Sequence, residues 1–191
     1  MEVTKTLPPG PRRDWRRWLE LNHADEREIW LLTQRPAPPG QLTYLDSVEE
    51  ALCFGWVDGI AKTHDGLTAQ RFTPRRKGSN WTELNKERAR RLIAGGWMRP
   101  AGARVLPDLD PAHFQLPPEI EARLRADPEV WNNFQSFPGL YQRVRVDNIA
   151  SVARVPADYE RRLATLIEKT KKKQMFGNWD DSGMARTPPE P

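Results

Sequence analysis

The sequence predicts an α+β fold: a small antiparallel sheet packed with helices, followed by a mostly helical C-terminal part. Short apolar segments at residues 29–34, 56–62 and 67–73 predict strands, and amphipathic segments around them predict helices. The 191 residues include eight Trp, six Phe and three Tyr, an investment in large apolar side chains that favours a packed core. Five prolines between residues 100 and 118 indicate a linker after the sheet.

The first helix is expected at residues 14–22, after a Pro- and Gly-containing stretch at 1–11 that predicts a disordered tail. Trp15, Trp18 and Leu19 are spaced by three and one residues, which places them on one helical face. That face would pack against the sheet.

A second helix is expected at residues 46–55, where Asp46 or Ser47 can cap the N-terminus and Gly55 lies near the end. The dipeptide Asp65-Gly66 then separates two strand-like segments. An Asp-Gly pair in this position is typical of a β-hairpin.

A third helix is expected at residues 81–94. Asn80 followed by Glu83 matches a capping pattern, and two glycines after the segment provide a stop. Farther along, Pro156 suits the first turn of a helix. An apolar stripe at helical spacing follows it, made of Tyr159, Leu163, Leu166 and Ile167.

These elements predict an organisation in consecutive parts. We expect an α+β core at residues 12–104, a Pro-rich linker at 105–118, a helical part at 119–179 packed on the core, and a tail at 180–191.

Composition excludes several classes of protein. No apolar run reaches the roughly 18–20 residues of a membrane span, and the first residues lack the apolar region of a secretory signal, so we expect a cytoplasmic protein without membrane insertion. The single cysteine excludes an intramolecular disulfide and a thiolate metal cage. The three histidines are scattered, so neither a metal nor a cofactor is predicted.

The net charge of +4 is unevenly distributed. Residues 71–104 contain ten basic and two acidic side chains, whereas residues 19–70 contain three basic and nine acidic ones. The basic segment could bind an anionic ligand, a nucleic acid or an acidic protein face. Alternatively, it could dock against the acidic segment of the same chain.

Several stretches carry a family resemblance. They are ALCFGWVDG at 51–59, RFTPRRKGSNWTELNKER at 71–88 and MRPAG at 98–102, with IEKT at 167–170 and MFGNW at 175–179 near the C-terminus. Together they resemble the YdeI/OmpD-associated family, also called bacteriocin-protection proteins. The resemblance implies a protein linked to bacteriocin or antimicrobial-peptide tolerance and stress tolerance, and it supplies no catalytic residues.

The best candidate site follows the path from a strand through a basic turn to a helix N-terminus. Unpaired N–H groups and the helix dipole favour anions at such an end, and nearby cations add full charges. The candidate ligand-binding residues are Arg71, Arg75, Arg76, Lys77, Ser79, Asn80, Trp81, Asn85 and Arg88. The alternative is structural: Asn80 only caps the helix, Glu83–Lys86 and Glu87–Arg91 pair along it, and residues 75–77 form a solvated turn.

Nucleic acid is one version of the anion hypothesis. Phe72, Trp81 and Trp97 lie among the basic residues and could stack on bases, although tryptophans at helical spacing also suit a core. The basic set to test comprises Arg75, Arg76, Lys77, Arg88 and Arg90.

Two further functions remain open. An enzyme acting on a small phosphorylated or carboxylated ligand could use Asp58, beside Arg71 or Arg75, as general acid or base. Asp58 could equally form a structural ion pair, and Cys53 in its apolar run is expected to be a buried thiol. A protein-interaction module would use exposed Trp or the basic face.

Overall fold

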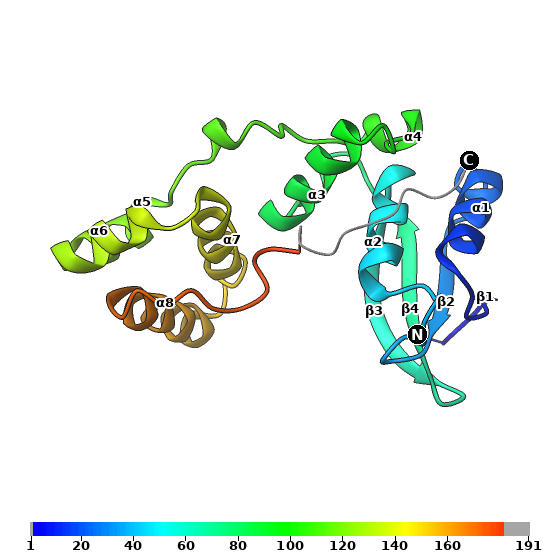
Figure 1. Ribbon diagram of the computed structural model, residues 1–191, viewed down its shortest axis with the longest axis horizontal. Helices are drawn as coiled ribbons and strands as arrows, with labels where there is room; N and C mark the ends of the chain where they lie inside the picture. Colours follow the sequence, from blue (N-terminus) through cyan, green and yellow to red (C-terminus); the bar gives the residue numbers. More distant parts are fainter. Residues whose placement is uncertain (1, 182–191) are drawn as a thin grey trace. The chain divides into compact units, whose positions relative to one another are not determined.

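The computed structural model describes residues 2–181 and contains a mixed four-stranded sheet with helices, as an α+β protein (Figure 1). The strand order is β1-β2-β4-β3. The strands are β1 (Thr6–Leu7), β2 (Ile29–Thr33), β3 (Trp56–His64) and β4 (Leu67–Pro74). The three strands expected from the sequence are present and antiparallel. Most of the predicted tail at 180–191 lies outside the described residues.

Strand β1 pairs in parallel with β2, so the sheet is mixed where an antiparallel one was expected. It forms within the segment predicted to be a disordered tail. The backbone N–H of Trp30 donates to the carbonyl of Lys5 at 2.9 Å, and the Thr4 hydroxyl donates to the Glu28 carboxylate at 2.6 Å. These long-range bonds satisfy backbone groups along the edge of β2, which local sequence cannot indicate.

The described residues divide into two compact units. The first comprises residues 2–80 and 88–107, and the second comprises residues 81–87 and 108–181. Helix α3 (Glu83–Ala94) contributes residues to both.

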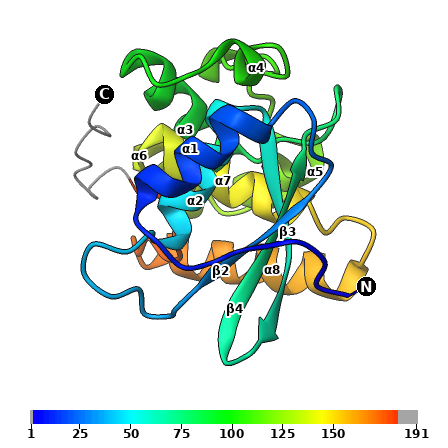
Figure 2. The same cartoon turned by 90° about the vertical axis from the view of Figure 1, so that its right-hand side faces the viewer.

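In the first unit, helices α1 (Arg12–Asn22) and α2 (Tyr44–Cys53) cover the same face of the sheet, and α1 lies nearer the viewer than α2 in Figure 2. Trp15 of α1 packs on Phe72 of β4, with ring centroids 5.1 Å apart. Tyr44 of α2 bonds to Asp58, which lies opposite Phe72 in the β3–β4 register. Opposed residues share a face, which places both helices on one side. The short helix α4 (Pro100–Ala103) follows α3.

The expected hairpin is confirmed between β3 and β4. Asp65 and Gly66 both have positive φ, of 48° and 77°, as a two-residue type I′ loop requires. An irregularity in β3 follows Asp58, and the buried Gln70 side chain donates to the Gly59 carbonyl there at 2.7 Å.

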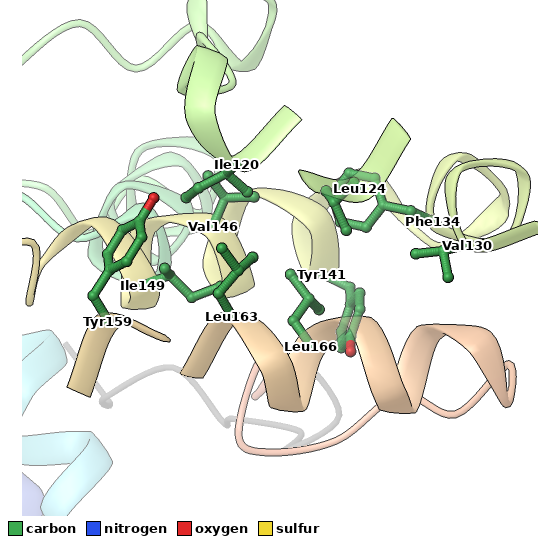
Figure 3. Close-up of a cluster of buried hydrophobic side chains, with 10 residues drawn as sticks. All are labelled: Ile120, Leu124, Val130, Phe134, Tyr141, Val146, Ile149, Tyr159, Leu163 and Leu166. Atoms are coloured by element: carbon green, nitrogen blue, oxygen red, sulfur yellow. The ribbon is translucent and has the colours of Figure 1, made fainter. Parts of the chain in front are cut away.

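The second unit is helical, and its four main helices bury a common core (Figure 3). They are α5 (Pro118–Arg125), α6 (Pro128–Ser136), α7 (Gly139–Ala150) and α8 (Pro156–Lys171), preceded by the 3-10 turn η1 (Pro111–His113). Pro156 begins α8 as expected. Leu163 and Leu166 of the predicted stripe are fully buried against Tyr141 and Ile149 of α7.

Within residues 2–181, no helix combines the length and the apolar character that crossing a membrane requires.

Candidate functional site

Arg71 and Arg75, the first two candidate residues, bond within the first unit. The Nε of Arg71 donates to the Glu28 carboxylate at 2.8 Å. Arg75 is only 7% exposed; its Nη1 donates to the Asn80 carbonyl at 2.9 Å and lies 3.4 Å from the Ser79 hydroxyl. Arg75 is therefore not a solvated residue of the turn; its buried guanidinium binds the Asn80 carbonyl at the end of the turn. Burial lowers the pKa of Arg75.

The turn itself carries two exposed cations, Arg76 and Lys77. Gly78 follows with a φ of 74°, a conformation that glycine adopts without a steric penalty. Arg88 and Arg90 lie half-buried on α3. The exposed charge of the predicted basic set is thus concentrated at the tip of the turn.

The N-terminus of α3 differs from the expectation that Asn80 caps it. The helix begins at Glu83, and the hydroxyl of Thr82 accepts a bond from the N–H of Asn85 at 3.2 Å. The N–H of Glu83 donates to the Asp147 carboxylate of α7 at 3.1 Å. An internal anion therefore already occupies the end that was predicted to attract one.

Charged side chains of α3 form ion pairs within the helix and with other elements. Lys86 pairs with Glu83 at 2.6 Å, as the spacing predicted. Glu83 also lies 3.3 Å from the Arg143 guanidinium. Arg91 of the same helix lies 4.0 Å from Glu49 of α2.

The aromatic side chains proposed for base stacking are not available as a platform. Phe72 is fully buried and Trp81 is 6% exposed. The half-buried Trp97 lies under two guanidinium groups, those of Arg12 at 5.0 Å and Arg16 at 5.8 Å from the ring centroid. The burial of Phe72 and Trp81 agrees with a core role for these two aromatics.

Ion pairs connect the basic segment 71–104 with the acidic segment 19–70. Arg71 pairs with Glu28, Arg91 with Glu49, and Arg99 with Glu20. Intramolecular docking thus uses part of the basic charge, as the structural alternative expected.

Asp58 belongs to a cluster that the sequence identified only in part. Its carboxylate accepts a hydrogen bond from the Tyr44 hydroxyl at 2.7 Å. The guanidinium of Arg35 lies 5.2 Å from the Tyr44 ring centroid. Arg75 interacts electrostatically with Asp58, and Arg88 with Tyr44. We call these five residues the Tyr44 cluster.

In the Tyr44 cluster, the charges of three guanidinium groups act on one carboxylate or one phenol. Burial and the adjacent Asp58 raise the pKa of Tyr44 to about 12, while Arg88 and Arg35 oppose the shift. The phenol therefore stays protonated at neutral pH and serves as a hydrogen-bond donor. That single O–H is donated to Asp58. The guanidinium groups beside the 43% exposed Tyr44 are therefore the groups that can offer an anion donors and positive charge.

Tyr44 and Arg35 were missed by sequence reasoning. Helix α2 begins two residues earlier than expected, because Thr43 is its cap. Thr43 and Asp46 exchange the reciprocal bonds of a capping box. The Thr43-to-Asp46 spacing was the available signal, and it would have placed Tyr44 at the start of the helix.

Other catalytic chemistries find little support in these residues. Cys53 is fully buried, and burial raises the pKa of its thiol to about 12, so it is not a thiolate nucleophile. In the part of the chain that the structure describes, no three His, Cys, Asp or Glu side chains are grouped as metal ligands would be.

Family models match two successive stretches of the chain. Residues 9–105 match a model described as "Domain of unknown function (DUF8412)". Residues 113–173 match one described as "Bacteriocin-protection, YdeI or OmpD-Associated". The predicted family resemblance is confirmed over 113–173, although the motifs at 51–102 fall in the other match. Neither a curated protein nor a solved structure shows significant similarity to the chain.

Proposed function

This chain belongs to the family described as a domain of unknown function (DUF8412), and we propose that it binds a phosphate-containing anion, without catalysis, at the Tyr44 cluster. The observation that carries the proposal is that Arg35 lies over the Tyr44 ring and that the charges of Arg75 and Arg88 act on the Tyr44–Asp58 pair. The three guanidinium groups supply the N–H donors and the positive charge that an anion requires. A phosphate group offers the acceptors that guanidinium groups recognise.

The geometry supports binding better than acid–base catalysis by Asp58. Its carboxylate already accepts the Tyr44 hydroxyl and faces the charge of Arg75. A general base must reach a substrate proton at hydrogen-bond distance, and these two partners hold Asp58 as a positioning group instead. Tyr44, with a pKa of about 12, is a poor proton donor in a reaction at neutral pH.

The second family match links the proposal to bacteriocin protection. Bacteriocins and antimicrobial peptides that are cationic would be repelled by a net charge of +4. Direct sequestration of such peptides is therefore disfavoured. A role through an anionic partner, within a stress response, agrees with the charge of the chain.

The test is equilibrium binding of the full chain to inorganic phosphate, a mononucleotide and a labelled oligonucleotide, each at two salt concentrations. We expect Arg35→Gln and Arg88→Gln each to weaken binding about tenfold, as loss of a charge-assisted bond should. Arg27→Gln, an exposed arginine outside the cluster, is the matched control. A steep salt dependence would indicate a nucleic acid, and a shallow one a small ligand.

Two outcomes contradict the proposal. If none of these anions binds, the proposed anion-binding function is wrong. If the cluster variants bind the anion with the same affinity as the Arg27→Gln control, the proposed site is wrong. Arg76→Gln combined with Lys77→Gln tests whether the exposed turn adds to the affinity.

A further inference from the structure

A pocket of about 200 Å³ lies between α7 and α8 in the second unit. Arg145, Arg161 and Arg162 line it together with three apolar side chains, Ile149, Leu166 and Phe176. No acidic residue is part of this lining. The pocket therefore combines an apolar body with cationic groups, separately from the Tyr44 cluster.

Arg145 is the group in this pocket whose charge is least compensated. Within residues 2–181 it forms no ion pair with a carboxylate, and its buried Nε has no hydrogen-bond acceptor. Burial and the charge of Arg162 both lower its pKa. A buried donor without an acceptor costs free energy, which a ligand acceptor would recover.

The other two arginines are partly engaged. Arg162 donates through Nη1 to the Asn148 carbonyl at 2.7 Å, which orients its guanidinium and leaves its remaining N–H groups outside that bond. Arg161 pairs with Asp158 at 2.5 Å on an exposed surface. The positive character of the pocket thus comes mainly from Arg145 and Arg162.

The segment after α8 closes on Arg145. The guanidinium lies 5.1 Å from the Phe176 ring centroid. A Cβ at Gly177, whose φ is 69°, would lie 2.5 Å from Nη1 of Arg145. Glycine at this position therefore allows the backbone to approach the guanidinium, and the aromatic ring covers it.

We infer that this pocket binds a small organic anion whose apolar part is about the size of a benzene ring. Cavities of roughly 150 Å³ accommodate benzene, so the volume suits one ring with one charged substituent. Ile149, Leu166 and Phe176 would contact the ring. Arg145 and Arg162 would bind the charged group, as a carboxylate or a phosphate monoester.

The experiment is calorimetric titration of the full chain with benzoate, phenyl phosphate, benzyl alcohol and inorganic phosphate. Benzoate and phenyl phosphate distinguish the two charged groups. We expect at least one of them to bind at least tenfold more tightly than both the neutral alcohol and inorganic phosphate. Arg145→Gln should weaken that binding about tenfold, the loss of one charge-assisted bond. Arg154→Gln, an exposed arginine outside the pocket, should leave it unchanged.

If Arg145→Gln fails to fold, NMR spectroscopy of the unsubstituted chain tests the same contact. The Nε–H resonance of Arg145 should shift on titration with the bound anion. Equal affinity for benzyl alcohol would overturn the inference, as would binding that leaves Arg145 unperturbed. Arg88→Gln should not alter benzoate binding, so failure of this site and failure of the Tyr44 cluster are distinguishable.

Discussion

The Asp147 carboxylate of α7 accepts a hydrogen bond from the backbone N–H of Glu83, the first residue of α3, at 3.1 Å. Residues 64 positions apart in the sequence thereby complete one helix terminus. Burial is the main cause that raises the pKa of Asp147, and the Glu83 N–H opposes it. The bond therefore satisfies an N–H group while it holds a charge in a poorly solvated place.

A carboxyl with a raised pKa binds its proton more tightly in the folded than in the unfolded state. The free energy of unfolding due to Asp147 is therefore greatest at low pH, and it declines as pH rises from the ordinary value of 3.8 through the raised one. We therefore expect the free energy of unfolding of Asp147→Asn to increase relative to that of the unsubstituted chain as the pH rises through this range. Urea unfolding between about pH 4 and pH 7 measures the difference.

Asp147→Ala is the companion variant. It removes the acceptor as well as the charge, so it should be about 1 kcal/mol less stable than Asp147→Asn at neutral pH. Equal stabilities of the two variants would contradict the capping role. A difference in stability between the unsubstituted chain and Asp147→Asn that does not change with pH would contradict the raised pKa.

Glu50 is the fully buried carboxylate between α1 and α2. It pairs with Arg16 at 2.7 Å and with Arg12 at 2.5 Å. Glu50→Ala leaves two largely buried guanidinium groups without this partner, so it should cost about 3–5 kcal/mol of unfolding free energy. Glu20→Ala removes a 44% exposed partner of Arg16 and should cost at most about 1 kcal/mol. Similar losses in the two variants by urea unfolding would contradict this difference.

The hairpin and the buried arginines show where sequence reasoning succeeds and where it ends. Asp65-Gly66 identified its turn because both residues must adopt positive φ, a local requirement. The inward position of Arg75 depends on the Asn80 carbonyl and on Asp58 of another strand. The cap of α3 likewise depends on Asp147. No local pattern reports such partners, and the pocket around Arg145 was missed for the same reason: its residues come from three segments.

Gly102 of α4 lies against the C-terminus of α2. A Cβ there would be 2.4 Å from the Cys53 carbonyl oxygen and 2.6 Å from that of Leu52. Both obstacles are backbone atoms, so the helices must move apart to admit it. We expect Gly102→Ala to cost about 1–3 kcal/mol of unfolding free energy, as overpacking does. Gly59→Ala, whose nearest contact would be 3.8 Å, is the control and should cost less. Equal stability of the Gly102→Ala and unsubstituted chains would show that α4 can shift freely.

Cys53 offers a direct probe of that same contact. Its side chain is fully buried and burial raises its pKa to about 12, so at mildly alkaline pH the thiol is both protonated and inaccessible. A disulfide reagent should therefore react with the folded chain only through transient opening, far more slowly than with the chain in urea.

The carbonyl of Cys53 accepts the N–H of Arg99, just before α4, at 3.1 Å. Because Gly102→Ala disturbs that contact, it should speed labelling of the folded chain, whereas Gly59→Ala should not. Rapid labelling of the unsubstituted chain would contradict the burial of the Cys53 thiol. Equal labelling rates in the two variants would show that exposure of the thiol does not depend on the α2–α4 contact.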